Sequence, residues 1–76
     1  MRYFFHTEDG RRFCDEEGTE LPTEAAARLE AARVLGQLMN EDPATAWHGE
    51  SLRLRVTDSD NRPLFTLAVV ATIAGR

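Results

Sequence analysis

The fold of this chain is decided by residues 2–13, which read RYFFHTEDGRRF. The first six alternate as a strand does, and Asp9-Gly10 predicts a two-residue hairpin turn whose central residues need positive φ angles. Residues 11–14 follow as a short return strand. The N-terminus therefore predicts an aromatic-rich β-hairpin, on which we expect the rest of the sheet to be built.

One helix is expected after the polar turn that begins at Asp15. Thr23 is a suitable N-cap, and Glu24 follows it where the helix dipole favours a negative charge. The helix is expected to end near Glu41, since the residue before Pro43 is disfavoured in the α region.

Apolar residues at helical spacing suggest which side of this helix faces the sheet. The expected stripe consists of Ala25, Leu29, Ala32, Leu35, Gly36 and Met39. Ala27, Ala31, Val34 and Leu38 widen the apolar side, and Val34 and Leu38 are left for another contact.

The C-terminal third predicts two more strands, over residues 51–57 and 64–70, after a loop in which Trp47 is expected to plug the end of the core. The element order β-β-α-β-β predicts an α+β fold with a four-stranded antiparallel sheet and the helix on one face. Counted along the chain, the expected strand order is 2-1-3-4, with 2-1-4-3 as the alternative.

Parity along the strands divides the side chains between the two faces of the sheet. The helix-facing set is Tyr3, Phe5, Leu52, Leu54, Val56, Phe65, Leu67 and Val69. The open face receives Phe4, His6, Arg53, Arg55, Thr66 and Ala68.

Composition restricts the class of protein. Seventy-six residues predict a single domain over 1–76. Cys14 is the only cysteine, which excludes an internal disulfide and suits a reducing compartment. The N-terminus does not resemble a secretory signal, and the longest apolar stretch is too short for a membrane span. We expect a cytoplasmic protein that does not enter the membrane.

The sequence also resembles a known family. The RYFFH opening, the Asp9-Gly10 turn, the stretch DEEGTELP at 15–22 and the alanine-rich helix are similar to a family of small bacterial proteins, seen mainly in alphaproteobacteria. That family is catalogued only as a domain of unknown function. The resemblance implies a stand-alone cytoplasmic domain and assigns no catalytic or binding residue.

Candidate chemistry is sparse, and we expect no enzyme, no cofactor and no metal. Cys14 and His6 could face each other across the hairpin as in an activated thiol, but a cysteine without a chemical role is the commoner case. Asp58-Ser59-Asp60-Asn61 resembles the start of a calcium loop, yet it lacks the later glycine and glutamate and predicts a turn.

Two classes of function remain. The first is a regulatory or inhibitory protein-interaction module with a protein partner, which the small size and the net charge of −4 favour. The second is a nucleic-acid-binding domain that would use Phe4, His6, Arg53 and Arg55 on the open face. Nucleic-acid binding is the weaker hypothesis, since one aromatic residue makes a poor stacking platform and the acidic turns repel phosphate.

The last strand points to a homodimer. In the order 2-1-3-4 it lies at the sheet edge, yet residues 64–73 carry no charge. The residues expected at a dimer edge are Phe65, Leu67, Val69 and Ile73. In the order 2-1-4-3 the same strand would be internal and would need no partner.

Overall fold

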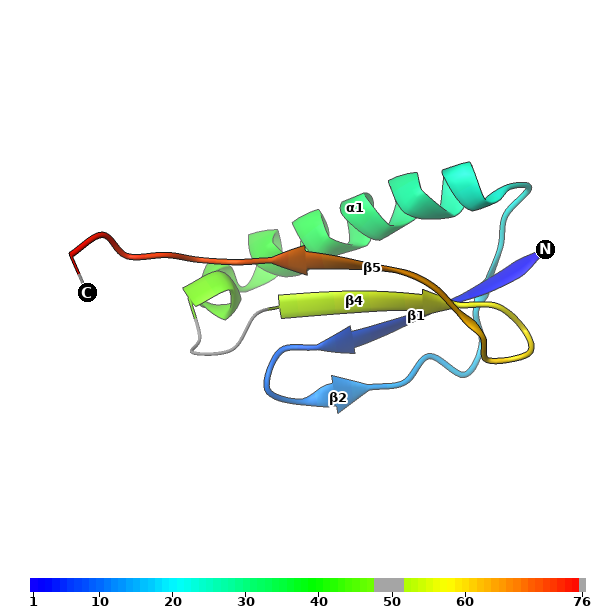
Figure 1. The fold of residues 1–76 in the computed structure, drawn as a ribbon, viewed down its shortest axis with the longest axis horizontal. Helices are drawn as coiled ribbons and strands as arrows, with labels where there is room; N and C mark the ends of the chain where they lie inside the picture. The colour runs from blue at the N-terminus through cyan, green and yellow to red at the C-terminus, as the bar shows by residue number, and fades with distance from the viewer. Residues whose placement is uncertain (48–51, 76) are drawn as a thin grey trace.

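The computed structural model of the protein describes residues 1–47 and 52–75. Figure 1 shows the elements in chain order. They are β1 (Arg2–Glu8), β2 (Arg12–Phe13), β3 (Thr19–Glu20), α1 (Glu24–Glu41), the 3₁₀ helix η1 (Pro43–Trp47), β4 (Leu52–Thr57) and β5 (Pro63–Val69).

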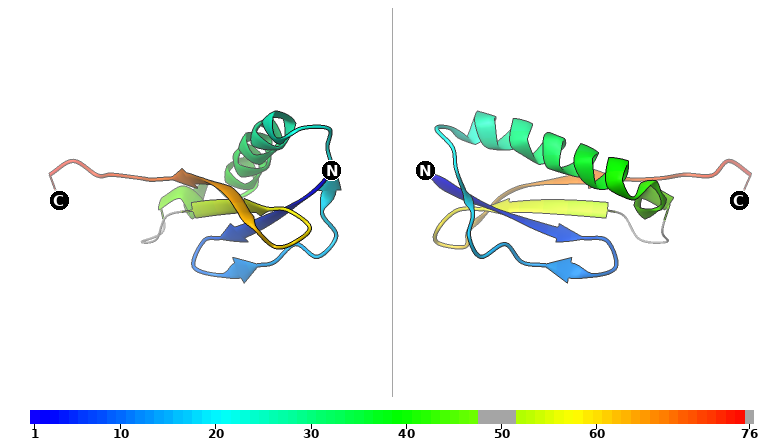
Figure 2. Two further views of the ribbon diagram at one scale, coloured as in Figure 1. Left: turned by 45° about the vertical axis from the view of Figure 1, so that its right-hand side comes forward. Right: turned by 180° about the vertical axis from the view of Figure 1, so that it is seen from behind.

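The strands form one antiparallel sheet with α1 across one of its faces (Figures 1 and 2), so the fold is α+β as predicted. The main path through the sheet is β2-β1-β4-β5. The sheet differs in detail from the prediction, since it has five strands rather than four. The missed strand, β3, pairs with the start of β1, where Arg2 lies opposite Glu20.

Contacts at the chain start explain why β3 forms. The amino group of Met1 donates to the Glu20 carboxylate at 2.6 Å, and the Leu21 N–H donates to the Met1 carbonyl at 3.0 Å. These bonds hold residues 19–21 alongside β1. The N-terminal hairpin also differs from the prediction, because the pairing of Glu8 with Arg12 leaves a three-residue turn and a shorter return strand.

The helix has the predicted boundaries. The Thr23 hydroxyl accepts the Ala26 N–H at 3.1 Å, and the Asp42 N–H donates to the Leu38 carbonyl at 3.0 Å beyond the last turn. Within residues 1–47 and 52–75, no helix combines the length and apolar character that a membrane crossing requires.

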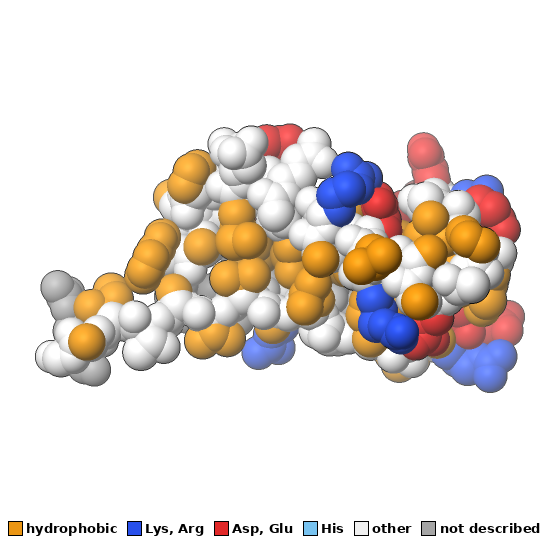
Figure 3. Space-filling view, turned by 90° about the horizontal axis from the view of Figure 1, so that it is seen from above, with side chains coloured by type: hydrophobic (Ala, Val, Ile, Leu, Met, Phe, Trp, Pro, Cys, Tyr) orange, Lys and Arg blue, Asp and Glu red, His pale blue; other side chains and the backbone are white. Residues whose placement is uncertain are grey.

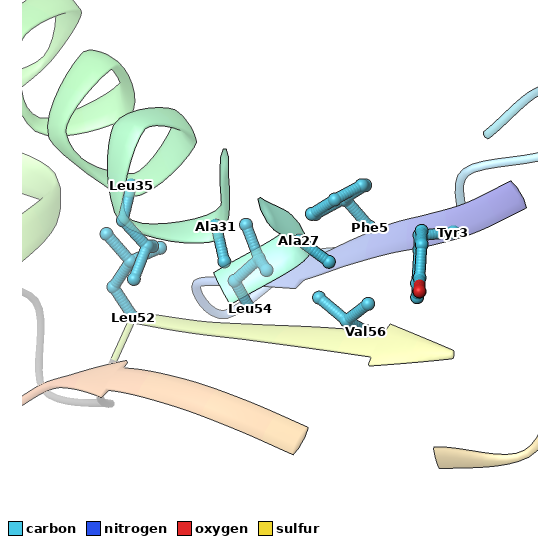
Figure 4. Close-up of a cluster of buried hydrophobic side chains, with 8 residues drawn as sticks. All are labelled: Tyr3, Phe5, Ala27, Ala31, Leu35, Leu52, Leu54 and Val56. Atoms are coloured by element: carbon cyan, nitrogen blue, oxygen red, sulfur yellow. The ribbon is translucent and has the colours of Figure 1, made fainter. Parts of the chain in front are cut away.

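The core lies between α1 and the two central strands, β1 and β4 (Figure 4). Its buried members are Tyr3, Phe5, Ala27, Ala31, Leu35, Leu52, Leu54 and Val56. Two of the three helix contributions are alanines, so the helix backbone approaches the sheet closely, and Leu54 lies fully buried beneath it. All five of the predicted inward residues on β1 and β4 are therefore in the core.

The predicted helix stripe was correct only in part, since Leu35 is buried and Met39 packs against the core but its other four residues are exposed. Leu29 is 76% exposed, and Ala25, Ala32 and Gly36 are also exposed. The face that packs on the sheet carries Ala27, Ala31, Leu35, Val34 and Leu38, so the last two are not left for another contact. Apolar residues occur around most of this helix, and its spacing alone could not distinguish the two faces.

Trp47 does not plug the core, because it is 64% exposed. Thr45 is the buried residue of η1 instead. A 3₁₀ helix has three residues per turn, so side chains two positions apart point in different directions.

A close backbone approach occurs at Gly18, in the turn between β2 and β3. Its φ angle is +73°, and a Cβ there would lie 2.9 Å from the Tyr3 carbonyl oxygen and 2.9 Å from Phe4 Cε2. Only glycine meets both conditions without strain.

The chain beyond β5 extends away from the body. The molecule measures 44 × 20 × 20 Å, and the C-terminal segment projects along the long axis (Figures 1 and 3). Val70 is 71% exposed and Ile73 is 51% exposed, so the apolar side chains of this segment are largely open to solvent.

Two leucines test the assignment of the core. Leu54→Ala removes a fully buried side chain and should lower the free energy of unfolding by about 2–5 kcal/mol. Leu29→Ala makes the same chemical change at an exposed helix position and should alter it by less than about 0.5 kcal/mol. Urea denaturation of both variants measures the difference; equal losses would contradict the assignment.

Two glycines test the strained turn. Gly18→Ala meets backbone and needs a positive φ angle, so it should destabilise the protein by about 1–3 kcal/mol. Gly36→Ala lies in α1 with nothing within 4 Å of the new Cβ and should stabilise it by about 0.5–1 kcal/mol. Thermal melts should therefore shift in opposite directions, and a shared direction would disprove the account.

Candidate functional site

The structure brings the four predicted binding-face residues together on the side of the sheet opposite α1. In the register of β1 and β4, His6 lies opposite Arg55, Phe4 lies opposite Thr57, and Glu8 lies opposite Arg53. Side chains at paired positions of antiparallel strands share a face, so this surface carries an imidazole between an aromatic ring and two guanidinium groups.

His6 is held at both ring nitrogens. Its Nδ1 accepts the Asp15 N–H at 3.1 Å, and its Nε2 lies 3.0 Å from the Thr57 hydroxyl. Because Nδ1 is an acceptor, the proton of the neutral ring is on Nε2, which donates to Thr57. The imidazole therefore links the 15–18 turn to β4 and is neutral in this arrangement.

The Asp15 carboxylate organises the turn beside β1. One oxygen accepts the Phe5 N–H at 3.1 Å, and the other accepts the N–H groups of Glu17 at 3.1 Å and Gly18 at 3.0 Å. Burial alone would raise the pKa of Asp15, but these donors and the adjacent His6 outweigh it and hold the pKa below its ordinary value. From the sequence alone, Asp15 is predicted only as part of a polar turn.

The pKa of His6 is also lowered. Burial is the largest cause, the Arg55 guanidinium adds to it, and the Asp15 carboxylate opposes both. Desolvation and a neighbouring positive charge both disfavour the imidazolium, which agrees with the neutral tautomer that the hydrogen bonds require.

A shallow concavity of about 250 Å³ lies on this face, between β1, β2 and β4 and beside Thr66 of β5. Three arginines line it: Arg12, Arg53 and Arg55. Arg12 pairs with Glu8 at 2.9 Å, whereas Arg53 and Arg55 form no ion pair with any residue in 1–47 or 52–75. Alternation along the strands predicted that His6, Arg53, Arg55 and Thr66 lie on this face. The positions of Glu8 and Arg12 could be assigned only from the hairpin register that the structure shows.

Cys14 lines the same concavity but does not form a thiol–imidazole pair. It is exposed, and both nitrogens of His6 are engaged by Asp15 and Thr57. The arrangement expected for an activated thiol is therefore not formed by the described residues. His48 lies outside the residues that the structure describes.

The turn between β4 and β5 is held by one buried carboxylate. One oxygen of Asp58, which is 8% exposed, accepts the N–H groups of Asp60 at 2.9 Å and Arg62 at 3.0 Å. The segment is thus a turn, as predicted. Across residues 1–47 and 52–75, no group of three or more His, Cys, Asp or Glu side chains is arranged to hold a metal ion.

The residues predicted for a dimer edge fall into two groups. Phe65 and Val69 are half-buried and pack against the core, whereas Leu67 is 36% exposed. Ile73 lies beyond the end of β5, in the projecting segment. The exposed apolar surface at this edge is therefore formed by Leu67 and the C-terminal residues.

The His6 network predicts how stability depends on pH. Since folding lowers the pKa of His6, the unfolded chain binds more protons as the pH falls, and acid favours unfolding. This contribution is complete above about pH 6.5, the pKa of an unfolded histidine, and is lost as the pH falls through the lower pKa of the folded state. The Asp15 contribution is lost only at more acid pH, below its ordinary pKa of 3.8.

Urea denaturation across this range measures the effect. His6→Gln should be less stable than the parent near neutral pH, and its stability should change less as the pH falls toward about 5. If the two pH profiles run parallel, His6 is not the group responsible.

Comparison with known proteins identifies a family. A search of curated proteins and a search of solved structures found no match. The family model for the domain of unknown function DUF6894 matches residues 2–71. The chain therefore belongs to the DUF6894 family.

Proposed function

We propose that this protein is a non-enzymatic interaction module that assembles as a homodimer through the free edge of β5. The observation that carries the proposal is the character of that edge. Residues 63–75 contain no charged side chain, and β5 pairs only with β4 among the described strands. Open backbone groups on such an edge invite a further strand.

The opposite edge of the sheet offers a contrast. It consists of two strands of two residues each, and it carries the charged side chains of Arg12 and Glu20. Short, charged edges are what monomeric sheets normally present to water. The difference between the edges supports a partner at β5.

A second copy of the chain is the occupant we favour. The protein has a net charge of −4, so association through most other surfaces would bring like charges together. The uncharged β5 avoids this repulsion, and a two-fold axis would pair each strand antiparallel with its copy. Figure 3 shows apolar side chains on the projecting C-terminal segment, and the same contact would cover them.

We further propose a regulatory or inhibitory role, in which the dimer binds another protein in the cytoplasm and covers part of its surface. Support for the compartment comes from the single, exposed Cys14, which has no cysteine in its own chain to pair with.

Nucleic-acid binding is the second candidate, since Phe4, His6, Arg53 and Arg55 share one open face. The surroundings of Phe4 argue against it. Phe4 is half-buried, and its Cε2 lies so close to Gly18 that an added Cβ would be 2.9 Å away. A ring with its edge covered by the 15–18 turn is a poor platform for stacking bases.

Light scattering at micromolar concentration tests the dimer. The parent should have the mass of two chains, and Leu67→Lys should have the mass of one, because a charge on the strand opposes edge pairing. Leu29→Lys adds the same charge at an exposed helix position and should remain dimeric. A monomeric parent would contradict the proposal, as would a dimer unaffected by Leu67→Lys. Tight binding of single-stranded RNA at physiological salt would favour the second candidate instead.

A further inference from the structure

We propose that the concavity on the open sheet face binds a small dianion, a phosphate monoester or a dicarboxylate, through Arg53 and Arg55. This site is separate from the β5 edge and does not depend on the dimer, because edge pairing extends the sheet in its own plane and leaves this face open.

The concavity carries an excess of positive charge. Three guanidinium groups line the concavity against the single carboxylate of Glu8, which is paired with Arg12. Two positive charges, those of Arg53 and Arg55, are thus uncompensated by the described residues. Such a concentration is unexpected on a protein with a net charge of −4, and it matches a ligand with two negative charges.

The two arginines of β4 are placed to bind one ligand together. Arg53 and Arg55 are alternate residues of β4, so they point to the same face with backbones about 7 Å apart. Their partners on β5 are the small residues Ala68 and Thr66, which leave space above the sheet. A guanidinium group presents parallel N–H donors that fit carboxylate and phosphate oxygens. The Thr66 hydroxyl lies beside Arg55 as a further donor.

Size and the neighbouring side chains restrict the ligand. A concavity of about 250 Å³ suits one anionic group with a short organic part, and it is too small for a length of polymer. His6 does not supply a charge, since both of its nitrogens are already hydrogen-bonded. The positive charge that binds the anion would therefore come from the arginines.

Titration of the ¹⁵N-labelled protein, followed by NMR at neutral pH, tests the proposal. The probes are inorganic phosphate and succinate, with sodium chloride at matched ionic strength as the reference. We expect saturable shifts at Arg53, Arg55 and Thr66 with at least one probe. The Arg53→Gln/Arg55→Gln variant should bind about tenfold more weakly or worse, because two charge-assisted contacts are lost.

The matched control is Arg28→Gln/Arg33→Gln. It removes the same two charges from exposed positions of α1, where each arginine is paired with a glutamate, and should bind within about twofold of the parent. Saturation by one probe alone supports the site and identifies the anion as phosphate or carboxylate. Shifts that do not saturate, that chloride reproduces, or that both variants lose equally would overturn the proposal. Single-stranded DNA serves as a third probe. Saturable shifts with DNA and none with phosphate or succinate would also overturn the proposal.

Discussion

The arrangement of this small sheet depends on one carboxylate. Asp15 accepts three backbone N–H groups, from Phe5 on β1 and from Glu17 and Gly18 in its own turn. The Phe5 N–H lies between the part of β1 that pairs with β2 and the part that pairs with β3. Among the described residues, the Asp15 side chain takes the place of a strand partner for that donor. Without it, a backbone N–H would be left unpaired at a half-buried position.

The effect of this residue reaches the other side of β1 through His6. The Asp15 N–H donates to Nδ1 of the imidazole, which leaves the ring proton on Nε2, and Nε2 donates to Thr57 on β4. A turn near the N-terminus is thus connected to the central strand from the C-terminal third. The same bonds hold the 15–18 turn over Phe4, which leaves that ring half-buried.

The sequence was sufficient for the parts of the fold that follow from local rules. Alternation placed Tyr3, Phe5, Leu52, Leu54 and Val56 in the core, and the Thr23 cap and Pro43 marked the ends of α1. It was insufficient where a choice depended on tertiary contacts. β3 forms because hydrogen bonds join Met1 to Glu20 and Leu21, which are far from it in the sequence. The buried side of α1 is the one on which two alanines let the helix approach the sheet closely.

The candidate site was predictable to the same extent and for the same reason. Parity along β1 and β4 assigned His6, Arg53 and Arg55 to one face, because each position depends only on its own strand. The role of Asp15 depends on a donor ten residues away, and the pairing of Glu8 with Arg12 depends on a hairpin register that is one residue longer than the Asp-Gly signal predicts. The pairing of Glu8 with Arg12 also decides which arginines of the face are left without a carboxylate partner. Since the Glu8 carboxylate is engaged by Arg12 on the neighbouring strand of the hairpin, it forms no ion pair with Arg53, which lies opposite it on β4. The guanidinium groups of this surface that have no carboxylate partner among the described residues are therefore Arg53 and Arg55, which lie two residues apart on β4.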